Sequence, residues 1–147
     1  MATDTTVTRT NYFKVTDISR FRDIMSKTHC DLELEVWEKE DGRVGFGGYG
    51  SIIGFMKEIN DPDDPDTLEY ESYDDSYDDF AKALQNVIAE GDACIIMEVG
   101  NCKLRSVYGD ATIIAKDGIQ YMNFREMAIG NARKILRDDG WDTETDY

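Results

Sequence analysis

Apolar residues recur at helical spacing in three parts of the chain and predict three helices. The first is expected over Ile18–Lys27, with Thr16 or Asp17 as its N-cap. The second begins near Ser76 and ends at Glu90-Gly91, where glycine favours termination. The third is expected over Phe124–Arg137, with these side chains directed inward: Phe124, Met127, Ala128, Ile135 and Leu136.

Alternating or β-branched patterns predict strands through most of the remaining chain. In Asp31–Lys39, the side chains of Leu32, Leu34 and Val36 are expected on the buried face of a half-buried strand. Asp41-Gly42 and Asp117-Gly118 are hairpin-turn signals. The other expected strands are Asn11–Val15, Arg43–Phe46, Ser51–Lys57, Leu68–Tyr73, Ala93–Val99, Lys103–Val107, Ala111–Lys116 and Ile119–Met122, with a turn at Gly100-Asn101.

Hairpins dominate over regular strand–helix alternation, which predicts an α+β fold. We expect one domain over residues 11–137, with a mainly antiparallel sheet and about three helices packed on one side of it. The Thr-rich residues 1–10 are expected to be a loose arm, residues 58–79 an acidic insertion and residues 138–147 an acidic tail. Pro62 and Pro65 predict a loop over Asn60–Asp66.

Charge changes the picture, because it is concentrated in two segments. The chain of 147 residues has 16 basic and 31 acidic side chains and a net charge of −15. Glu58–Asp79 holds eleven carboxylates and Asp138–Tyr147 holds five, and neither segment contains a basic residue. Without these 16 acids, 15 acidic and 16 basic residues remain, so the rest of the chain is balanced. Such segregation favours a surface that meets a basic partner.

The same composition argues against direct binding to nucleic acid or to an anionic membrane, since both require a basic footprint. No apolar run approaches the length of a membrane span or a signal peptide, so we expect a soluble, cytoplasmic protein. Cys94 lies in an apolar run, where a buried thiol is the ordinary interpretation.

Motifs for cofactor, metal or catalytic chemistry are weak. Gly45–Gly50 matches the dinucleotide pattern G-x-G-x-x-G, but a strand is expected after it in place of a helix, so we interpret it as a Gly-rich strand connection or bulge. Asp61–Ser72 lacks the glycine and the final glutamate of an EF-hand loop. His29 has no nucleophile near it in sequence. We therefore predict no catalytic residue, metal or cofactor.

Aromatic residues interleave with the acids, which is typical of interfaces and uncommon in purely solvating tails. The predicted partner-binding residues are Asp63, Asp64, Asp66, Glu69, Tyr70, Glu71, Tyr73, Asp74, Asp75, Tyr77, Asp78 and Asp79. A secondary acidic set consists of Glu33, Glu35, Asp138, Asp139, Asp142, Glu144 and Asp146. Duplex DNA carries one charge per roughly 3.4 Å of strand. The acidic stretch, if extended, carries one per roughly 6.6 Å, so mimicry of DNA requires several acidic elements on one face.

In size, acidity and α+β pattern, the chain resembles the small acidic inhibitors of phages and mobile elements, which include DNA-mimicking anti-restriction and anti-CRISPR proteins. The resemblance covers overall character and rests on no specific motif. It implies a non-enzymatic inhibitor that occupies the nucleic-acid-binding surface of a basic protein, such as a defence nuclease. The chain also resembles acidic immunity proteins that neutralise nuclease toxins.

Two alternatives remain open at this point. In the first, the chain is a small enzyme or ligand-binding domain whose acidity is incidental, with a site among Gly47, Tyr49, Lys103, Arg105 and Tyr108. In the second, it is a structural adaptor whose acidic loops only aid solubility.

Overall fold

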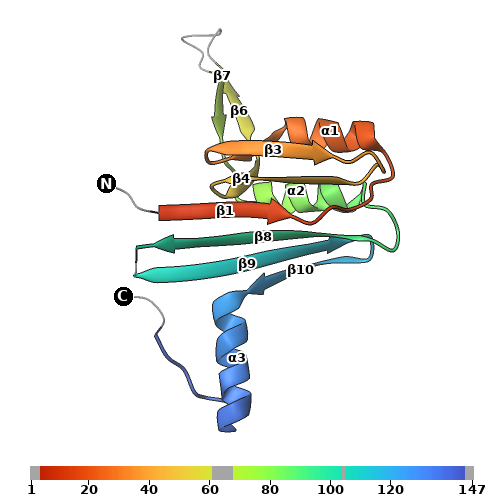
Figure 1. Ribbon diagram of the computed structural model, residues 1–147. Coiled ribbons are helices and arrows are strands. Elements are labelled where there is room, and N and C mark those ends of the chain that lie inside the picture. Colours follow the sequence, from red (N-terminus) through yellow and green to blue (C-terminus); the bar gives the residue numbers. More distant parts are fainter. Residues whose placement is uncertain (1–3, 61–67, 104, 145–147) are drawn as a thin grey trace.

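A six-stranded antiparallel sheet forms the centre of the molecule, with strand order β10-β9-β8-β1-β4-β3 (Figure 1). The computed structural model describes residues 4–60, 68–103 and 105–144. In chain order the elements are β1 (Asp4–Thr10), α1 (Ile18–Ser26), β2 (Thr28–Cys30), β3 (Glu33–Glu38), β4 (Val44–Tyr49), β5 (Ile52–Phe55), β6 (Lys57–Asn60), β7 (Leu68–Glu71), α2 (Ser76–Gln85), β8 (Ala93–Cys102), β9 (Ser106–Ala115), β10 (Gly118–Asn123) and α3 (Phe124–Leu136). The strands β2 and β5 form one separate pair and β6 and β7 another. The predicted α+β class is confirmed.

Residues Asp4–Thr10 form strand β1 at the centre of the sheet, so the prediction of a loose arm is wrong for these residues. Strand β1 pairs with β8 on one side and with β4 on the other. Its buried side chains, Thr8 and Thr10, are threonines whose hydroxyls bond to backbone groups. The Thr8 hydroxyl donates to the Gly50 carbonyl at 2.9 Å, and the Thr10 hydroxyl accepts from the Phe46 amide at 3.0 Å. β-branched side chains favour strands, and these hydrogen bonds remove the cost of burying a hydroxyl.

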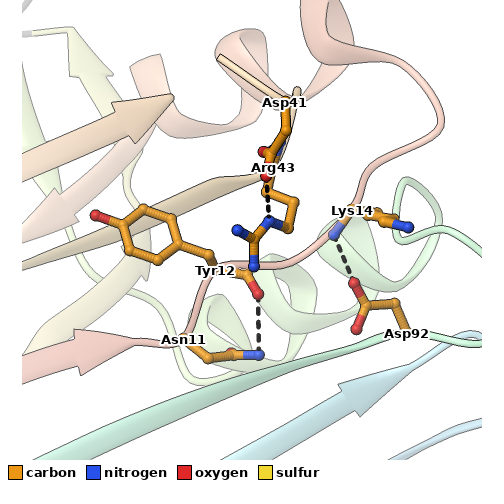
Figure 2. Close-up of polar contacts among 6 residues, drawn as sticks. All are labelled: Asn11, Tyr12, Lys14, Asp41, Arg43 and Asp92. Carbon is orange, nitrogen blue, oxygen red and sulfur yellow. Dashed lines mark hydrogen bonds and ion pairs between the residues drawn. The ribbon is translucent and has the colours of Figure 1, made fainter. Parts of the chain in front are cut away.

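The expected strand Asn11–Val15 is reduced to two isolated bridges, Phe13 to Val44 and Val15 to Ile88. Side-chain hydrogen bonds hold this segment, whereas a regular strand would be held by a ladder of backbone hydrogen bonds. The Asn11 carboxamide donates to the Ala93 carbonyl and accepts from the Ile95 amide, so it satisfies the edge of β8 beyond the end of β1. Figure 2 shows the neighbouring contacts, in which the backbone amide of Lys14 donates to the Asp92 carboxylate at 2.7 Å.

Helices α1 and α2 cover one face of the sheet, and phenylalanines fill the space between the layers. Phe13 contacts Phe21 of α1 and Phe46 of β4, and Phe46 contacts Phe80 of α2, all edge to face with ring centroids 5.9–6.4 Å apart. All four side chains are fully buried. Asp17 caps α1 as predicted, by accepting from the amides of the two residues after Ile18.

The Gly-rich segment Gly45–Gly50 lies in β4 and the turn after it, and no helix follows it. It does not serve as a connection. Strand β4 lies between β1 and β3, and the backbone of β3 is close to it. A Cβ at Gly48 would lie 1.8 Å from the Glu33 carbonyl oxygen, so no larger residue fits there.

The Asp41-Gly42 and Asp117-Gly118 hairpins are confirmed, as are the pairing of β7 at an edge and the burial of Cys94. Burial raises the pKa of the Cys94 thiol. Several elements have other boundaries than predicted. Strand β8 continues through Gly100-Asn101, the two expected strands Lys103–Val107 and Ala111–Lys116 are replaced by the single strand β9, and α2 ends at Gln85. Helix α2 ends early, but Val87 and Ile88 after it are still buried in the core.

The predicted inward faces of β3 and α3 are largely wrong. Of the three side chains expected inward from this strand, only Leu34 is partly buried, and Leu32 and Val36 are exposed. Trp37, expected on the outer face, is partly buried. Helix α3 extends away from the sheet (Figure 1). All five α3 side chains that were expected inward are exposed, and Ile129 is the buried one. Within the part of the chain that the structure describes, no helix is both long enough and apolar enough to cross a bilayer.

Candidate functional site

The β6–β7 hairpin presents carboxylates on both of its faces and projects beyond the rest of the molecule (Figure 1). Glu58 of β6 is directly opposite Tyr70 of β7, so these two side chains share one face. Glu69 and Glu71 flank Tyr70 in the strand and therefore lie on the other face. All three glutamates are exposed.

The N-terminus of α2 places four more carboxylates next in the chain. Asp74 and Asp75 precede the helix, and Asp78 and Asp79 lie in its first turn, where the helix dipole favours negative charge. The helix start is held against β5, because the Ser76 hydroxyl donates to the Ile53 carbonyl at 3.2 Å. These acids are therefore on a fixed element of the fold.

Two tyrosine hydroxyls orient the first-turn aspartates. Tyr73 donates to Asp79 at 3.1 Å and Tyr121 donates to Asp78 at 2.7 Å. Burial and the nearby Asp78 carboxylate raise the pKa of Tyr121 to about 12. Burial, and then the bond to Asp79, raise the pKa of Tyr73. Tyr121 is not among the predicted site residues, because it lies 43 residues from Asp78 in the chain and no local pattern signals the contact.

The three tyrosines of the predicted site have different environments. Tyr70 is half exposed, with its ring centroid 5.3 Å from that of His29. Tyr73 is partly buried beside Asp79. Tyr77 is turned into the fold, where its hydroxyl bonds to the Thr112 hydroxyl at 2.8 Å and its ring contacts that of Phe80. Tyr70 and Tyr73 are therefore better placed than Tyr77 to touch a partner.

We refer to the exposed carboxylates of this region as the acidic segment. They are Glu58, Glu69, Glu71, Asp74, Asp75, Asp78 and Asp79. Among the described residues, ion pairs join Arg22 to Glu38, Lys27 to Asp23, Arg43 to Asp41 and Arg125 to Asp142. None of these pairs includes a member of the acidic segment. Its charge is therefore not neutralised within the described chain, and it is directed to solvent.

The secondary acidic residues do not join the acidic segment on one surface. Glu33 and Glu35 lie opposite Tyr49 and Gly47 of β4, on the face of the sheet away from the core residue Phe46. The chain after α3 runs back along that helix, at the opposite end of the molecule from β6 and β7 (Figure 1).

Side chains of α3 hold this C-terminal segment. Arg133 donates to the Trp141 carbonyl at 2.6 Å, and Arg125 donates to the Thr143 carbonyl. Asp138, Asp139, Asp142 and Glu144 therefore form a second, separate acidic surface. The predicted site residues Asp63, Asp64, Asp66 and Asp146 lie outside the described residues.

The residues considered for a ligand or enzyme site do not converge. Gly47 and Tyr49 lie in β4, whereas Tyr108 lies in β9, and strands β8 and β1 separate these two strands in the sheet. Lys103 and Arg105 belong to the connection between β8 and β9. The Tyr108 hydroxyl bonds to the Thr6 hydroxyl.

Over the ranges that the structure describes, no group of three or more His, Cys, Asp or Glu side chains is arranged to hold a metal ion. Comparison with protein-family models, with curated proteins and with solved structures found no significant match to this chain. The charge, exposure and geometry of the acidic segment are therefore the basis for a functional proposal.

Proposed function

We propose that this chain is a non-enzymatic binding protein whose acidic segment occupies a basic, nucleic-acid-binding surface of a partner protein. The observation that carries the proposal is the set of seven exposed carboxylates on β6, β7 and α2, none of which is paired with a base in the described chain. A defence nuclease, such as a CRISPR effector or a restriction enzyme, is the partner class that the acidity favours. Alternatively, the chain neutralises a nuclease toxin, by the same contact between carboxylates and a basic surface.

The fixed geometry of the acids supports binding over a purely solubilising role. Because α2 and the β6–β7 hairpin hold the carboxylates in place, little conformational entropy is lost when they meet lysine and arginine side chains. Exposed carboxylates also accelerate the encounter with a basic surface through long-range attraction. Tyr70 and Tyr73 add aromatic area beside the charge, as is common at protein interfaces.

The geometry supports charge complementarity more than close mimicry of a DNA strand. The chain that carries the C-terminal acids lies along α3, at the opposite end of the molecule from β6 and β7, so these acids do not extend the acidic surface of the β6–β7 hairpin (Figure 1). The β6–β7 hairpin does fold part of the acidic stretch back on itself, with paired strands about 4.8 Å apart. The proposal therefore requires a basic groove or patch on the partner. It does not require the carboxylates to match the positions of successive phosphates.

A capture experiment with matched variants tests the proposal. The triple variant Glu69→Gln, Glu71→Gln and Asp74→Asn neutralises three exposed acids of the acidic segment. Their side chains make no hydrogen bond or ion pair with the described residues. The control variant Glu40→Gln, Glu90→Gln and Asp117→Asn removes the same charge from exposed acids that belong to neither acidic surface, so both proteins have a net charge of −12.

Partners are captured from host lysate at low and at high salt and identified by mass spectrometry. We expect a nucleic-acid-binding partner that is retained by the wild type and the control, is released by added DNA and is lost at about 1 M salt, where the Debye length is about 3 Å. The triple variant should bind roughly 3- to 150-fold more weakly, at about 0.2–1 kcal/mol for each exposed charge pair. Equal binding by the triple variant and the control, or binding unaffected by DNA and salt, would contradict the proposal.

A further inference from the structure

The face of the sheet opposite α1 and α2 carries an apolar groove of about 640 Å³. The register explains why its strand residues share one face: Val7 is opposite Val99 in β8, and Asn101 of the same face is opposite Val107 in β9. Six large apolar side chains line the groove, each 38–65% exposed: Val7, Met97, Val99, Val107, Phe124 and Met127. Apolar side chains gathered in this way on an open face mark an interaction surface.

Helix α3 begins at the groove, which Phe124 and Met127 line, and it extends away from the sheet (Figure 1). Phe124, Ala128 and Ile135 recur at helical spacing on one side and form an apolar ridge, in which Ile135 is 82% exposed. The chain's own C-terminal segment lies beside the first part of this ridge, where Trp141 and Thr143 share a pocket with Phe124, Ala128 and Val107. The outer part of the ridge, which also includes the exposed Leu136, is thus uncovered in the monomer.

The ridge cannot fill the groove of its own chain. Ile135 lies eleven residues after Phe124 on a continuous helix, about 16 Å further along the axis. A second copy removes this constraint, since a two-fold axis brings the ridge of each molecule to the groove of the other. We propose that the chain forms a two-fold homodimer in which the α3 helices lie antiparallel and Ile135 of each copy enters the partner copy's groove beside Val107.

The exposed area agrees with this arrangement. The six groove residues with Ile135 and Leu136 together expose the equivalent of about four and a half complete residues. At about 150 Å² for each large apolar residue, the low end of the range for aromatic side chains, this is roughly 700 Å². A stable dimer buries about 800 Å² on each partner, including a polar rim.

The distribution of charge also favours this contact between copies. The chain has a net charge of −15, so two copies repel each other overall. Residues 124–137 are the exception, with four basic side chains and one acidic side chain. Strands β6 and β7 lie at the opposite end of the molecule from α3 (Figure 1), whereas Asp78 at the start of α2 bonds to Tyr121 of β10, the strand that leads into α3. Pairing through α3 therefore keeps the two β6–β7 hairpins apart, and the basic side chains of α3, of which Arg125 pairs with Asp142, offset part of the charge of the acidic residues that follow the helix.

Light scattering coupled to size-exclusion chromatography tests the dimer on the full chain. From about 1 µM to about 100 µM, a range that covers weak and strong interfaces, we expect the wild type to reach a mass of twice 16.7 kDa. Ile135→Glu on the ridge and Val107→Glu in the groove should each restore the mass of 16.7 kDa. The matched control is Leu32→Glu, which adds the same charge at an apolar residue that is 79% exposed and outside the groove; it should remain dimeric.

Both substituted positions are well exposed, and circular dichroism checks that the variants remain folded. High salt should preserve the dimer, because it screens the repulsion between like-charged copies and does not weaken apolar contacts. A monomeric wild type over the whole concentration range would overturn the proposal. So would a dimer that survives both glutamate variants, a dimer that dissociates at high salt, or association into species of no fixed mass.

Discussion

Gly54 allows the start of α2 to lie directly against β5, and replacing it with alanine should destabilise the protein. Gly54 has φ +109, a conformation that residues with a Cβ rarely adopt. An added Cβ would lie 2.5 Å from the Ser76 carbonyl oxygen and 2.7 Å from its carbonyl carbon. Since these are backbone atoms at the first residue of α2, no side-chain rotation relieves the clash, and the helix must move.

The two effects set the magnitude. A strained backbone conformation costs about 1–3 kcal/mol, and overpacking in a well-packed site costs about 1–3 kcal/mol. Gly54→Ala should therefore lower the free energy of unfolding by about 2–6 kcal/mol. In a domain of this size each 1 kcal/mol corresponds to about 2–4 °C, so the thermal midpoint should fall by roughly 4–24 °C.

Thermal and urea unfolding, followed by far-ultraviolet circular dichroism, measure this change. Gly118→Ala is the matched control, because Gly118 does not have a positive φ and its added Cβ would meet no atom within 4 Å. The control should remain within about 0.5 kcal/mol of the wild type, as exposed substitutions usually do. A Gly54→Ala protein with the midpoint of the control would refute the inferred close approach of α2 to β5.

Three further changes test the core, the third helix and the acidic segment. Leu84→Ala should cost about 2–5 kcal/mol in urea unfolding, because Leu84 is fully buried, whereas Leu32→Ala at an exposed position should change stability by less than about 0.5 kcal/mol. Gly130→Ala should stabilise α3 by about 1 kcal/mol, because its added Cβ meets no atom within 4 Å, and a lower midpoint would contradict this. Burial, and then the hydrogen bond to Asp78, raise the pKa of Tyr121 from its ordinary value of about 10 to about 12 in the folded protein, so the protonated side chain contributes stability that is complete below pH 10 and is lost as the pH rises through about 12. The free energy of unfolding in urea should therefore fall more for the wild type than for Tyr121→Phe between pH 9 and pH 12. Equal decreases in the two proteins would contradict the contact.

Features with local causes were predicted well from the sequence. The N-cap at Asp17, the turns at Asp41-Gly42 and Asp117-Gly118, and the start of α2 at Ser76 all follow from the chemistry of a few neighbouring residues. The α+β class followed in turn, because hairpin signals outnumbered strand–helix alternation.

Features with distant causes were not predicted. The sequence of β1 is typical of a polar arm. This segment forms a central strand only because β8 and β4 supply its hydrogen-bond partners. The apolar residues of α3 predict that something covers them, but no pattern within the helix says whether the cover is the same chain. The side chain of Ile135 was expected inward for this reason, but it is exposed to solvent.

For the candidate site, the sequence by itself determined how much charge there is and where along the chain it lies. Only the tertiary structure decided which acids share a surface. It turned Tyr77 into the core, brought Tyr121 to Asp78 from a distant strand, and placed the C-terminal acids along α3, away from the acidic segment. The physical reason is that charge is a property of each residue, whereas proximity depends on strand pairing and packing between residues far apart in the chain.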